Sequence, residues 1–402
     1  MKVLLSAYAC QPDHGSEPGI GWNWAIHLAE AGCEVHVLTG SRNRNAVDAY
    51  LQRNPVPNLS FHYVDVPCID PSRGGAQRYC LWLYFSLREA RRLSRTMAFD
   101  VAHHVSYGSV LLPSPLWRLG VPTIFGPVGG AQTSPPSLLG YLGKAGTRER
   151  IRTFVIHVSR RLRIYRARMR RMSIVLAANQ DTFVHAESTG CRRVLLLCDT
   201  GLRSDYGADS SRRFIRSLPI RFLWVGRLLP RKGLPLALDA LARANPNTEL
   251  TLVGSGLDPE IVRRMIRERG LDGRVHWEGA RLPWMQVREA YATHDALLFT
   301  SIRDSFGSQN LEAMSVGLPV ISLRLGGARD FIPDAAGLKV EVGPTIRDTV
   351  NNFVDALNQF VNMSVEERNR MSEAAWRGAQ EFSWTRRAEV ATALYAEARG
   401  KP

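Results

Sequence analysis

The fold is decided by the stretch ALLFTSIRDSFGSQNLEAMSVGLPVIS, residues 296–322. An apolar run ends at Thr300, a Gly-Ser turn at Gly307 follows, a helix begins near Gln309, and a second apolar run starts at Pro319. Apolar runs without polar alternation are typical of parallel strands buried on both faces, and the helix between them supplies a right-handed crossover. The stretch therefore predicts a strand–helix–strand unit of a parallel α/β sheet.

The same alternation of short apolar runs and amphipathic segments continues along the chain. The expected strands are 2–7, 34–39, 60–66, 101–105, 122–125, 174–177, 194–197, 221–225, 248–253, 274–277, 296–300 and 319–322. Periodicity breaks over 199–218, before a fresh strand begins. We therefore predict an α/β protein of two doubly wound Rossmann-like domains, at residues 1–205 and 218–382, facing each other across a cleft at the carboxyl ends of both sheets.

Composition limits the class of protein. The chain has 402 residues, of which 45% are hydrophobic, and Lys+Arg 52 against Asp+Glu 37 gives a net charge of +15. These values exclude disorder, collagen and a small disulfide scaffold. Residues 1–200 carry +11 of the charge, so an anionic partner is expected there: a membrane surface, nucleic acid or a phosphorylated acceptor. The cysteine spacing indicates neither a metal site nor a disulfide framework, and no apolar run is long enough to predict a transmembrane helix.

A glycine-rich segment, Gly15–Trp22, follows the first expected strand. Gly19 and Gly21 would allow close backbone approach, and the helix that begins here would offer unpaired N–H groups to an anion. The spacing departs from G-x-G-x-x-G, so a nicotinamide enzyme is disfavoured. The alternative is a turn that only starts a helix.

A second glycine-flanked loop, Val225–Gly233, carries cations at the carboxyl end of the first strand of the second domain. A diphosphate can be neutralised here by the forked guanidinium of Arg227, next to Gly226, and by the compact ammonium charge of Lys232. The alternative is a solvated basic loop.

The opening stretch adds carboxylates to the same edge. Asp304 precedes the turn and is suited to a sugar hydroxyl, and Glu312 lies just inside the helix, where it can accept hydrogen bonds from a ribose. The helix N-terminus again points backbone N–H groups toward the expected cleft.

In this order, the motifs resemble the retaining glycosyltransferases of the GT-B fold, family 4 (glycosyl transferases group 1). The resemblance covers nearly the whole chain and is strongest over 221–330, where G-R-x-x-x-x-K, an E-x7-E-like element and Gly326-Gly327 follow one another. It implies a final helix at 383–402 that packs toward the N-terminal, acceptor-binding domain. The second domain would bind the nucleotide sugar.

The resemblance implies roles for single residues. Arg227 and Lys232 would stabilise the departing nucleotide, and Glu312 would hold the ribose. Asp304 stands where the family has the first Glu of E-x7-E, and its shorter side chain puts the contact with the sugar in doubt. The full nucleotide-sugar site would comprise Gly19, Gly21, Gly226, Arg227, Lys232, Arg281, Gly307, Ser308, Gln309, Asn310 and Glu312.

His103 and His104 resemble the strand end where the family places an active-site histidine. With Asp304, Arg227 and Lys232 they complete the expected catalytic set. Side chains alternate along a strand, so only one of the two imidazoles can face the cleft. The alternative for each is a structural histidine.

The function expected is retaining, metal-independent transfer of a hexose from a nucleotide-diphosphate sugar to a glycan or lipid-linked acceptor, in polysaccharide or glycolipid biosynthesis and without a cofactor. The alternatives are another GT-B enzyme, an epimerase or a phosphorylase, and a basic nucleic-acid-binding protein. Nucleic acid is disfavoured because no recognition motif appears.

Two arginine-rich segments, 148–171 and the flanks of 79–85, carry apolar residues at helical spacing. Such helices suit an anionic bilayer. We therefore expect a cytoplasmic protein with peripheral attachment to the inner membrane face. The alternative is that the apolar residues pack in the core and the arginines are simply solvated.

Overall fold

The computed structural model describes residues 1–67, 75–203, 206–207, 211, 214, 218–277, 279 and 284–400. They form two compact units. The first unit comprises Met1–Ala131, Ile156–Gly201 and Trp384–Pro402, and the second comprises Gln132–Val155 and Leu202–Ser383.

A parallel sheet forms the centre of the first unit. Its strands are β1 (Lys2–Ala7), β2 (Glu34–Gly40), β3 (Leu59–Val64), β4 (Val101–Ser106), β5 (Thr123–Val128), β6 (Ile174–Ala177) and β7 (Val194–Leu196). They lie in the order β3-β2-β1-β4-β5-β6-β7. The order reverses between β1 and β4, which is the mark of a doubly wound sheet.

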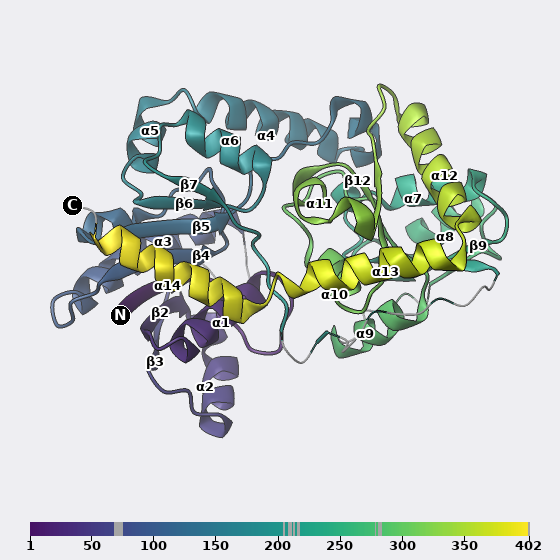
Figure 1. The fold of residues 1–402 in the computed structure, drawn as a ribbon. Helices are drawn as coiled ribbons and strands as arrows, with labels where there is room; N and C mark the ends of the chain where they lie inside the picture. Colours follow the sequence, from purple (N-terminus) through teal and green to yellow (C-terminus); the bar gives the residue numbers. More distant parts are fainter. Residues whose placement is uncertain are drawn as a thin grey trace. The chain divides into compact units, whose positions relative to one another are not determined.

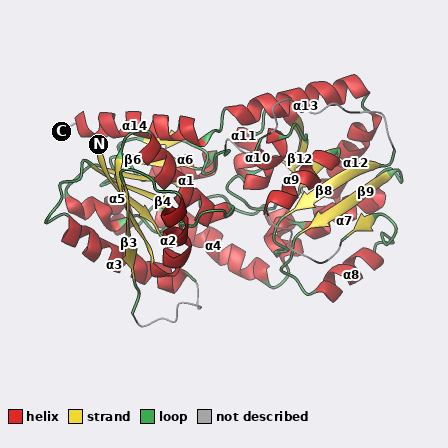
Figure 2. Ribbon diagram, turned by 90° about the horizontal axis from the view of Figure 1, so that it is seen from below, coloured by secondary structure: helices red, strands yellow, loops and turns green. Residues whose placement is uncertain are grey.

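Helices cover both faces of this sheet (Figures 1 and 2). They are α1 (Ser16–Glu30), α2 (Arg44–Arg53), α3 (Ala76–Leu93), the end of α4 (Ala145–Ser159), α5 (Arg163–Met169), α6 (Gln180–Ser188) and α14 (Trp384–Gly400), with 3-10 turns η1 (Ser41–Asn43) and η2 (Pro115–Leu119). Along β1, Val3 and Leu5 pack in one cluster with α1 and α14, whereas Leu4 packs in another with α3. Burial on both faces is why a central strand such as β1 shows an apolar run without polar alternation.

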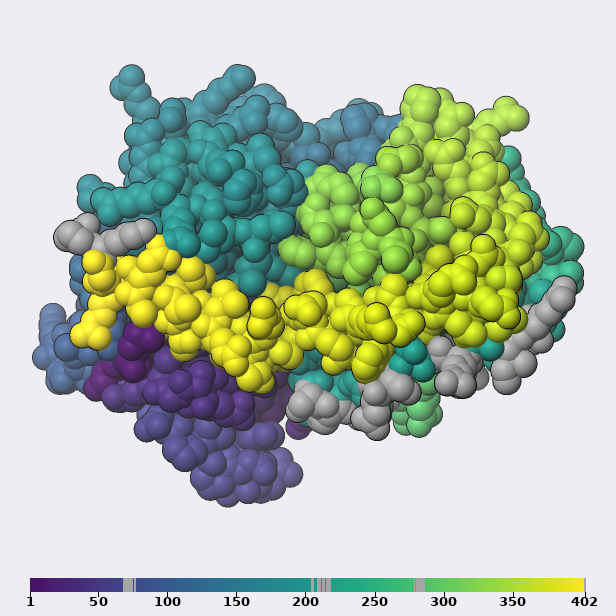
Figure 3. All heavy atoms as spheres, in the orientation of Figure 1, coloured from purple at the N-terminus to yellow at the C-terminus, as the bar shows by residue number. Residues whose placement is uncertain are grey.

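The C-terminal helix α14 packs against α1 in the first unit. In the space-filling view it lies as a yellow ridge over the purple N-terminal segment (Figure 3). Trp384, at its start, meets Trp24 edge-on with ring centroids 5.7 Å apart. Its indole also fills the space beside Gly201, where an added Cβ would lie 2.7 Å from the ring.

The second unit has its own parallel sheet. The strands are β8 (Ile220–Val225), β9 (Thr248–Val253), β10 (Val275–His276), β11 (Ala296–Phe299), β12 (Val320–Leu323) and β13 (Gly337–Val340), in the order β10-β9-β8-β11-β12-β13. The reversal lies between β8 and β11. Strand β13, which pairs with β12, was not among the predicted strands.

The helices of the second unit are α7 (Leu234–Arg243), α8 (Pro259–Arg267), α9 (Trp284–Thr293), α10 (Ser308–Ser315), α11 (Gly326–Phe331), α12 (Ile346–Asn362) and α13 (Val365–Gln380), with turns η3 (Pro136–Leu142), η4 (Pro230–Lys232) and η5 (Asp334–Ala336). Capping boxes start α12 at Thr345 and α13 at Ser364. Each box satisfies two backbone donors that a helix start leaves open.

The two parallel α/β sheets confirm the predicted fold class. The boundaries differ from the predicted 1–205 and 218–382, because residues 132–155 belong to the second unit. Leu138 and Leu142 pack in its core, and the Tyr141 hydroxyl donates to Asp239 of α7 at 2.6 Å. The second unit also begins earlier, at Leu202, whose N–H donates to Phe382 O at 2.7 Å.

None of the helices in the described ranges is long and apolar enough to cross a membrane. The five described cysteines, Cys10, Cys33, Cys80, Cys191 and Cys198, are free thiols, and Cys68 lies outside the described residues.

Candidate functional site

The reversal of strand order in the second unit brings two loops together. Ligands of open α/β sheets bind at this point, beyond the carboxyl ends of the strands. Trp224 of β8 donates its indole N–H to Thr300 Oγ1 at 3.1 Å, and Thr300 Oγ1 donates to Lys232 O at 3.2 Å. The N–H of Ile302 donates to Arg231 O at 2.8 Å. The loop after β8 is therefore fixed to the loop after β11.

A buried ion pair occupies the junction of these loops. Lys232 Nζ donates to Asp304 Oδ2, which also lies 3.4 Å from Arg231 Nη1 and accepts from Ser301 Oγ at 3.4 Å. Lys232 is only 8% exposed. Burial lowers the pKa of Lys232, and Asp304 offsets this only in part. Burial acts to raise the pKa of Asp304, but Lys232 and Arg231 outweigh it and the net shift is downward.

Asp304 thus lies in a network of cations, and its contact with a sugar hydroxyl stays a prediction. The backbone N–H of Ser305 donates to its second oxygen, Oδ1, at 3.2 Å. In this arrangement Asp304 orients Lys232 and Arg231.

More cations come from the 132–155 segment and from Arg303. Glu149 Oε1 pairs with Arg303 Nε at 2.9 Å and with Arg152 Nη1 at 3.3 Å. Burial lowers the pKa of Arg152 to about 10, with a further contribution from the charge of Arg303. Arg152 also donates to Gln132 O at 2.8 Å, and the Gln132 amide donates to Ser305 Oγ at 3.3 Å.

Sequence reasoning missed this second group. No local signal could have placed it here, because residues 132–155 reach the loop only through their packing on the second unit's core. Four cations, Arg152, Arg231, Lys232 and Arg303, pair with two carboxylates, Asp304 and Glu149. Arg227 adds an exposed fifth cation on the loop that carries Arg231 and Lys232. Cations that are partly buried and in excess favour an anion as the missing partner.

The backbone after β8 and β9 is packed too tightly for side chains. Gly254 has φ +152, and a Cβ there would lie 1.8 Å from Gly226 O. The predicted Gly226 also has a positive φ, and its N–H donates to Val253 O at 3.0 Å. Glycine at both positions keeps the loop low over the ends of the strands.

Helix α10 begins at the same edge. Its N-cap, Gly307, has φ +87, and no side chain caps the helix start at Ser308. Gln309 turns inward, and its Nε2 donates to Val225 O at 3.2 Å. Asn310 is fully buried, and its Nδ2 donates to Phe306 O at 2.6 Å. The side chains of Gln309 and Asn310 therefore hold the turn in place against the neighbouring backbone.

Glu312 is half-buried on α10, and its Oε2 accepts from the Tyr291 hydroxyl of α9 at 3.0 Å. Arg227 is exposed on the loop after β8. Arg281 lies outside the described residues.

The expected glycine loop of the first unit has a packing role. Gly19 and Gly21 are buried inside α1. A Cβ on Gly19 would lie 1.9 Å from His14 O, and one on Gly21 would lie 2.1 Å from Ala9 O. These contacts support the alternative that the segment starts a helix packed closely on the preceding loop.

His103 and His104 point to opposite faces of β4, as alternation requires, and both are fully buried. His103 lies 2.5 Å from Tyr395 Oη and 2.6 Å from Gly126 O. His104 lies 2.9 Å from Ser6 Oγ and 2.8 Å from Tyr79 Oη. Burial lowers the pKa of His103 to about 4 and of His104 to about 3. All four ring nitrogens thus have partners inside the first unit, as expected of structural histidines.

Comparison with known families adds to this geometry. Residues 209–377 match the family model "Glycosyl transferases group 1". The matched segment lies within the second unit. The match spans β8 to α13 and so contains both loops of the ion pair.

A curated relative, the lipopolysaccharide 1,6-galactosyltransferase of Salmonella typhimurium, is 36% identical over 155 residues, which are 38% of this chain and 42% of that protein. The aligned part of this chain thus covers about two fifths of the length of that relative.

Solved structures match over almost the whole chain. Sucrose-phosphate synthase from Thermosynechococcus elongatus aligns with a TM-score of 0.70 at 16% identity, over 98% of both chains. HepE from Anabaena in complex with UDP aligns with a TM-score of 0.61 at 17% identity, over 98% of this chain and all of the other. At these identities the likeness establishes the fold, two Rossmann-like domains of the GT-B type.

Proposed function

We propose that the protein is a retaining glycosyltransferase that moves a hexose from a nucleotide-diphosphate sugar to a glycan or lipid-linked acceptor. One observation carries the proposal: the excess of cations around the Lys232–Asp304 pair lies at the strand-order reversal of the sheet. The family match over residues 209–377 supports it, because the matched segment contains these residues.

The cations bind the donor diphosphate in this proposal. Lys232 is held in place by Asp304, and Arg227 stands exposed on the same loop, so a diphosphate can draw on both. Fixed cations in a partly dry site stabilise the charge that develops on the leaving nucleotide, and they need no reorganisation during the reaction. The same neutralisation makes a metal ion unnecessary.

The proposed transfer keeps the anomeric configuration of the donor. The acceptor oxygen forms a bond to the anomeric carbon on the face from which the diphosphate departs, and the carbon–phosphate-oxygen bond breaks. The leaving phosphate oxygen takes the proton of the acceptor hydroxyl. No histidine is needed as a base in this scheme, which agrees with the fully engaged His103 and His104.

The donor base and the acceptor are proposed by likeness. HepE was solved with UDP, so UDP-sugars are the first donors to try. The Salmonella relative acts on lipopolysaccharide by its name, which supports a glycolipid acceptor and a role in envelope glycan synthesis.

We further propose that α4 docks on an anionic membrane surface on the cytoplasmic side. Ile151, Phe154 and Val155 lie at i, i+3 and i+4 on one face of α4, and Phe154 is 68% exposed. Arginines flank them, among them Arg148 and Arg150. An exposed apolar face edged by cations is typical of helices that lie in the membrane interface.

The proposed docking is tested by flotation with vesicles of phosphatidylcholine alone or with 30% phosphatidylglycerol. The wild type is expected to float with the anionic vesicles, and Phe154→Glu is expected to remain in the pellet fraction. Equal behaviour of the two proteins would reject α4 as the docking helix.

Product analysis separates transfer from the other GT-B chemistries. Incubation with UDP-glucose and an acceptor glycan should release UDP and give a product whose anomeric configuration, read by proton NMR, matches the donor. An epimerised donor without acceptor transfer, or release of a sugar 1-phosphate, would assign an epimerase or a phosphorylase instead. Loss of transfer on addition of EDTA would remove the metal-independent scheme.

A further inference from the structure

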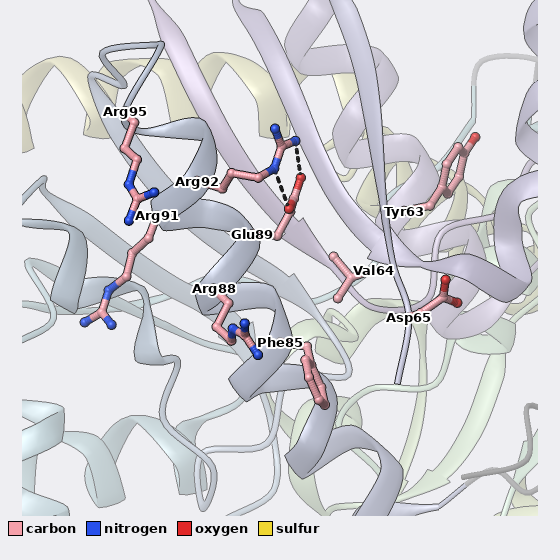
Figure 4. A pocket seen from close by; sticks show the side chains of 9 residues that line it. All are labelled: Tyr63, Val64, Asp65, Phe85, Arg88, Glu89, Arg91, Arg92 and Arg95. Atoms are coloured by element: carbon pink, nitrogen blue, oxygen red, sulfur yellow. Dashed lines mark hydrogen bonds and ion pairs between the residues drawn. The ribbon is translucent and has the colours of Figure 1, made fainter. Parts of the chain in front are cut away.

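The first unit contains a pocket of about 570 Å³ between α3 and the end of β3. Four arginines, Arg88, Arg91, Arg92 and Arg95, line it (Figure 4). This pocket, called here the arginine pocket, lies outside the family-matched residues 209–377 and holds none of the residues predicted for the donor site.

The arginines follow helical spacing. Arg88, Arg91 and Arg92 lie at i, i+3 and i+4 on α3, and Arg95 lies at i+7 in the turn after it, where its N–H donates to Arg92 O at 3.3 Å. All four side chains are exposed. Like charges three or four positions apart destabilise a helix by about 0.2–0.5 kcal/mol a pair. Such a stripe therefore lowers stability unless an anion lies against it.

The chain neutralises only part of this charge. Arg92 forms a two-pronged pair with Glu89, at 2.9 and 2.6 Å, and that hydrogen-bonded pair lowers the pKa of Glu89. Figure 4 shows Arg92 turned to Glu89, with Arg88 and Arg91 pointing away from the pair. Within the described ranges, no carboxylate lies at ion-pair distance from Arg88, Arg91 or Arg95.

The charge, size and lining of the pocket indicate its ligand. The lining contains four arginines and two carboxylates, Asp65 and Glu89. The net charge of the lining is therefore +2, and a ligand group of charge −2 would balance it. Guanidinium forks match the oxygens of phosphate, and a volume of about 570 Å³ is that of a small-molecule site. Half-buried Phe85 adds an apolar wall against which a sugar ring can lie.

We propose that the arginine pocket binds the phosphate of a phosphorylated saccharide. A saccharide phosphate carries both the dianion and the ring that the pocket accommodates. If the protein is the glycosyltransferase proposed above, this group is an anionic part of the acceptor; the binding of phosphate itself does not depend on that function.

The test is calorimetric binding of glucose 6-phosphate, with glucose and inorganic phosphate as comparison probes. In the double variant Arg88→Gln/Arg91→Gln, glucose 6-phosphate should bind at least tenfold more weakly, whereas glucose should bind neither protein. The matched control is Arg264→Gln/Arg267→Gln on α8, which removes two exposed arginines at the same spacing in the second unit and should keep wild-type affinity.

Three outcomes would overturn the proposal. The first is that the pocket variant binds glucose 6-phosphate as tightly as the wild type does. The second is that the control variant loses as much affinity for glucose 6-phosphate as the pocket variant. The third is that the pocket variant no longer binds phosphatidylglycerol vesicles although its affinity for glucose 6-phosphate is unchanged. Affinity for UDP-glucose should be the same in all three proteins. If glucose 6-phosphate binds but no glycosyl transfer occurs, the proposed phosphate binding in the arginine pocket is supported and only the proposed glycosyltransferase function is rejected.

Discussion

Replacing Lys232 by Met removes one partner of the buried pair and leaves Asp304 without its nearest cation. Breaking a buried ion pair from one side costs about 3–5 kcal/mol. Asp304 keeps Arg231 and Ser301, each at 3.4 Å, and the Ser305 N–H at 3.2 Å, so we expect a loss at the lower end of that range, about 3 kcal/mol.

The double variant Lys232→Met/Asp304→Leu should recover part of this loss, because it no longer leaves a lone charge buried. We expect a coupling free energy of about 2 kcal/mol between the two positions, since their atoms are in direct contact. Native-state hydrogen exchange over β8 and β11 measures the opening free energy of this region without assuming one transition for both units.

Additive effects, with a coupling below about 0.5 kcal/mol, would refute this reasoning. Lys232 and Asp304 would then be neighbours in space that do not depend on each other. The matched control is the exposed pair Arg263 and Glu260 at 2.7 Å, for which the coupling should stay below about 1 kcal/mol because water screens exposed charges.

Three further predictions follow from packing and burial. Gly254→Ala should destabilise the second unit by about 1–3 kcal/mol, because its Cβ would lie 1.8 Å from Gly226 O at φ +152; an unchanged melting temperature would contradict this. Trp384→Ala should cost about 3–5 kcal/mol and raise hydrogen exchange in α14, because Trp384 is buried against Trp24; unchanged protection of α14 would count against that packing. Burial lowers the pKa of His103 to about 4 and of His104 to about 3. Their contribution to the free energy of unfolding is therefore complete above the unfolded pKa near 6.5 and falls as the pH drops toward 4. For the two histidines together, the limiting loss is about 2.7 kcal/mol per pH unit. Urea denaturation at pH 7, 6, 5 and 4 measures that slope, and a flat profile would mean that neither ring is held neutral.

Most of the fold could be predicted because its signal is local. The apolar run 296–299 lies on a strand buried on both faces, so the sequence shows it without a polar interruption. Strand β13 was missed because Gly337–Val340 has only four residues, with a glycine and a lysine among them. Nothing local indicates that it pairs with β12.

The candidate site was predictable where motif and strand end coincide, as at Lys232 and Asp304. The contributions of Glu149 and Arg152 were not, because their segment is far away along the chain and reaches the second unit only through the packing of Leu138 and Leu142.

The histidine pair shows the same limit. The partner of His103 on α14 is 292 positions away. No spacing rule connects residues that far apart, so the sequence alone could not show that His103 has a hydrogen-bond partner on α14.

The measurement that tests the central claim most directly is calorimetric binding of UDP and of uridine to the wild type and to Arg227→Gln. The account predicts that UDP binds, that uridine binds at least about 100-fold more weakly, and that Arg227→Gln weakens UDP by about tenfold or more because one charge-assisted contact of about 1.5–3 kcal/mol is lost. Arg264→Gln, on α8, should bind UDP like the wild type. Equal affinity for UDP and uridine, or a UDP affinity that Arg227→Gln leaves unchanged, would contradict the assignment of this cation loop to the donor diphosphate.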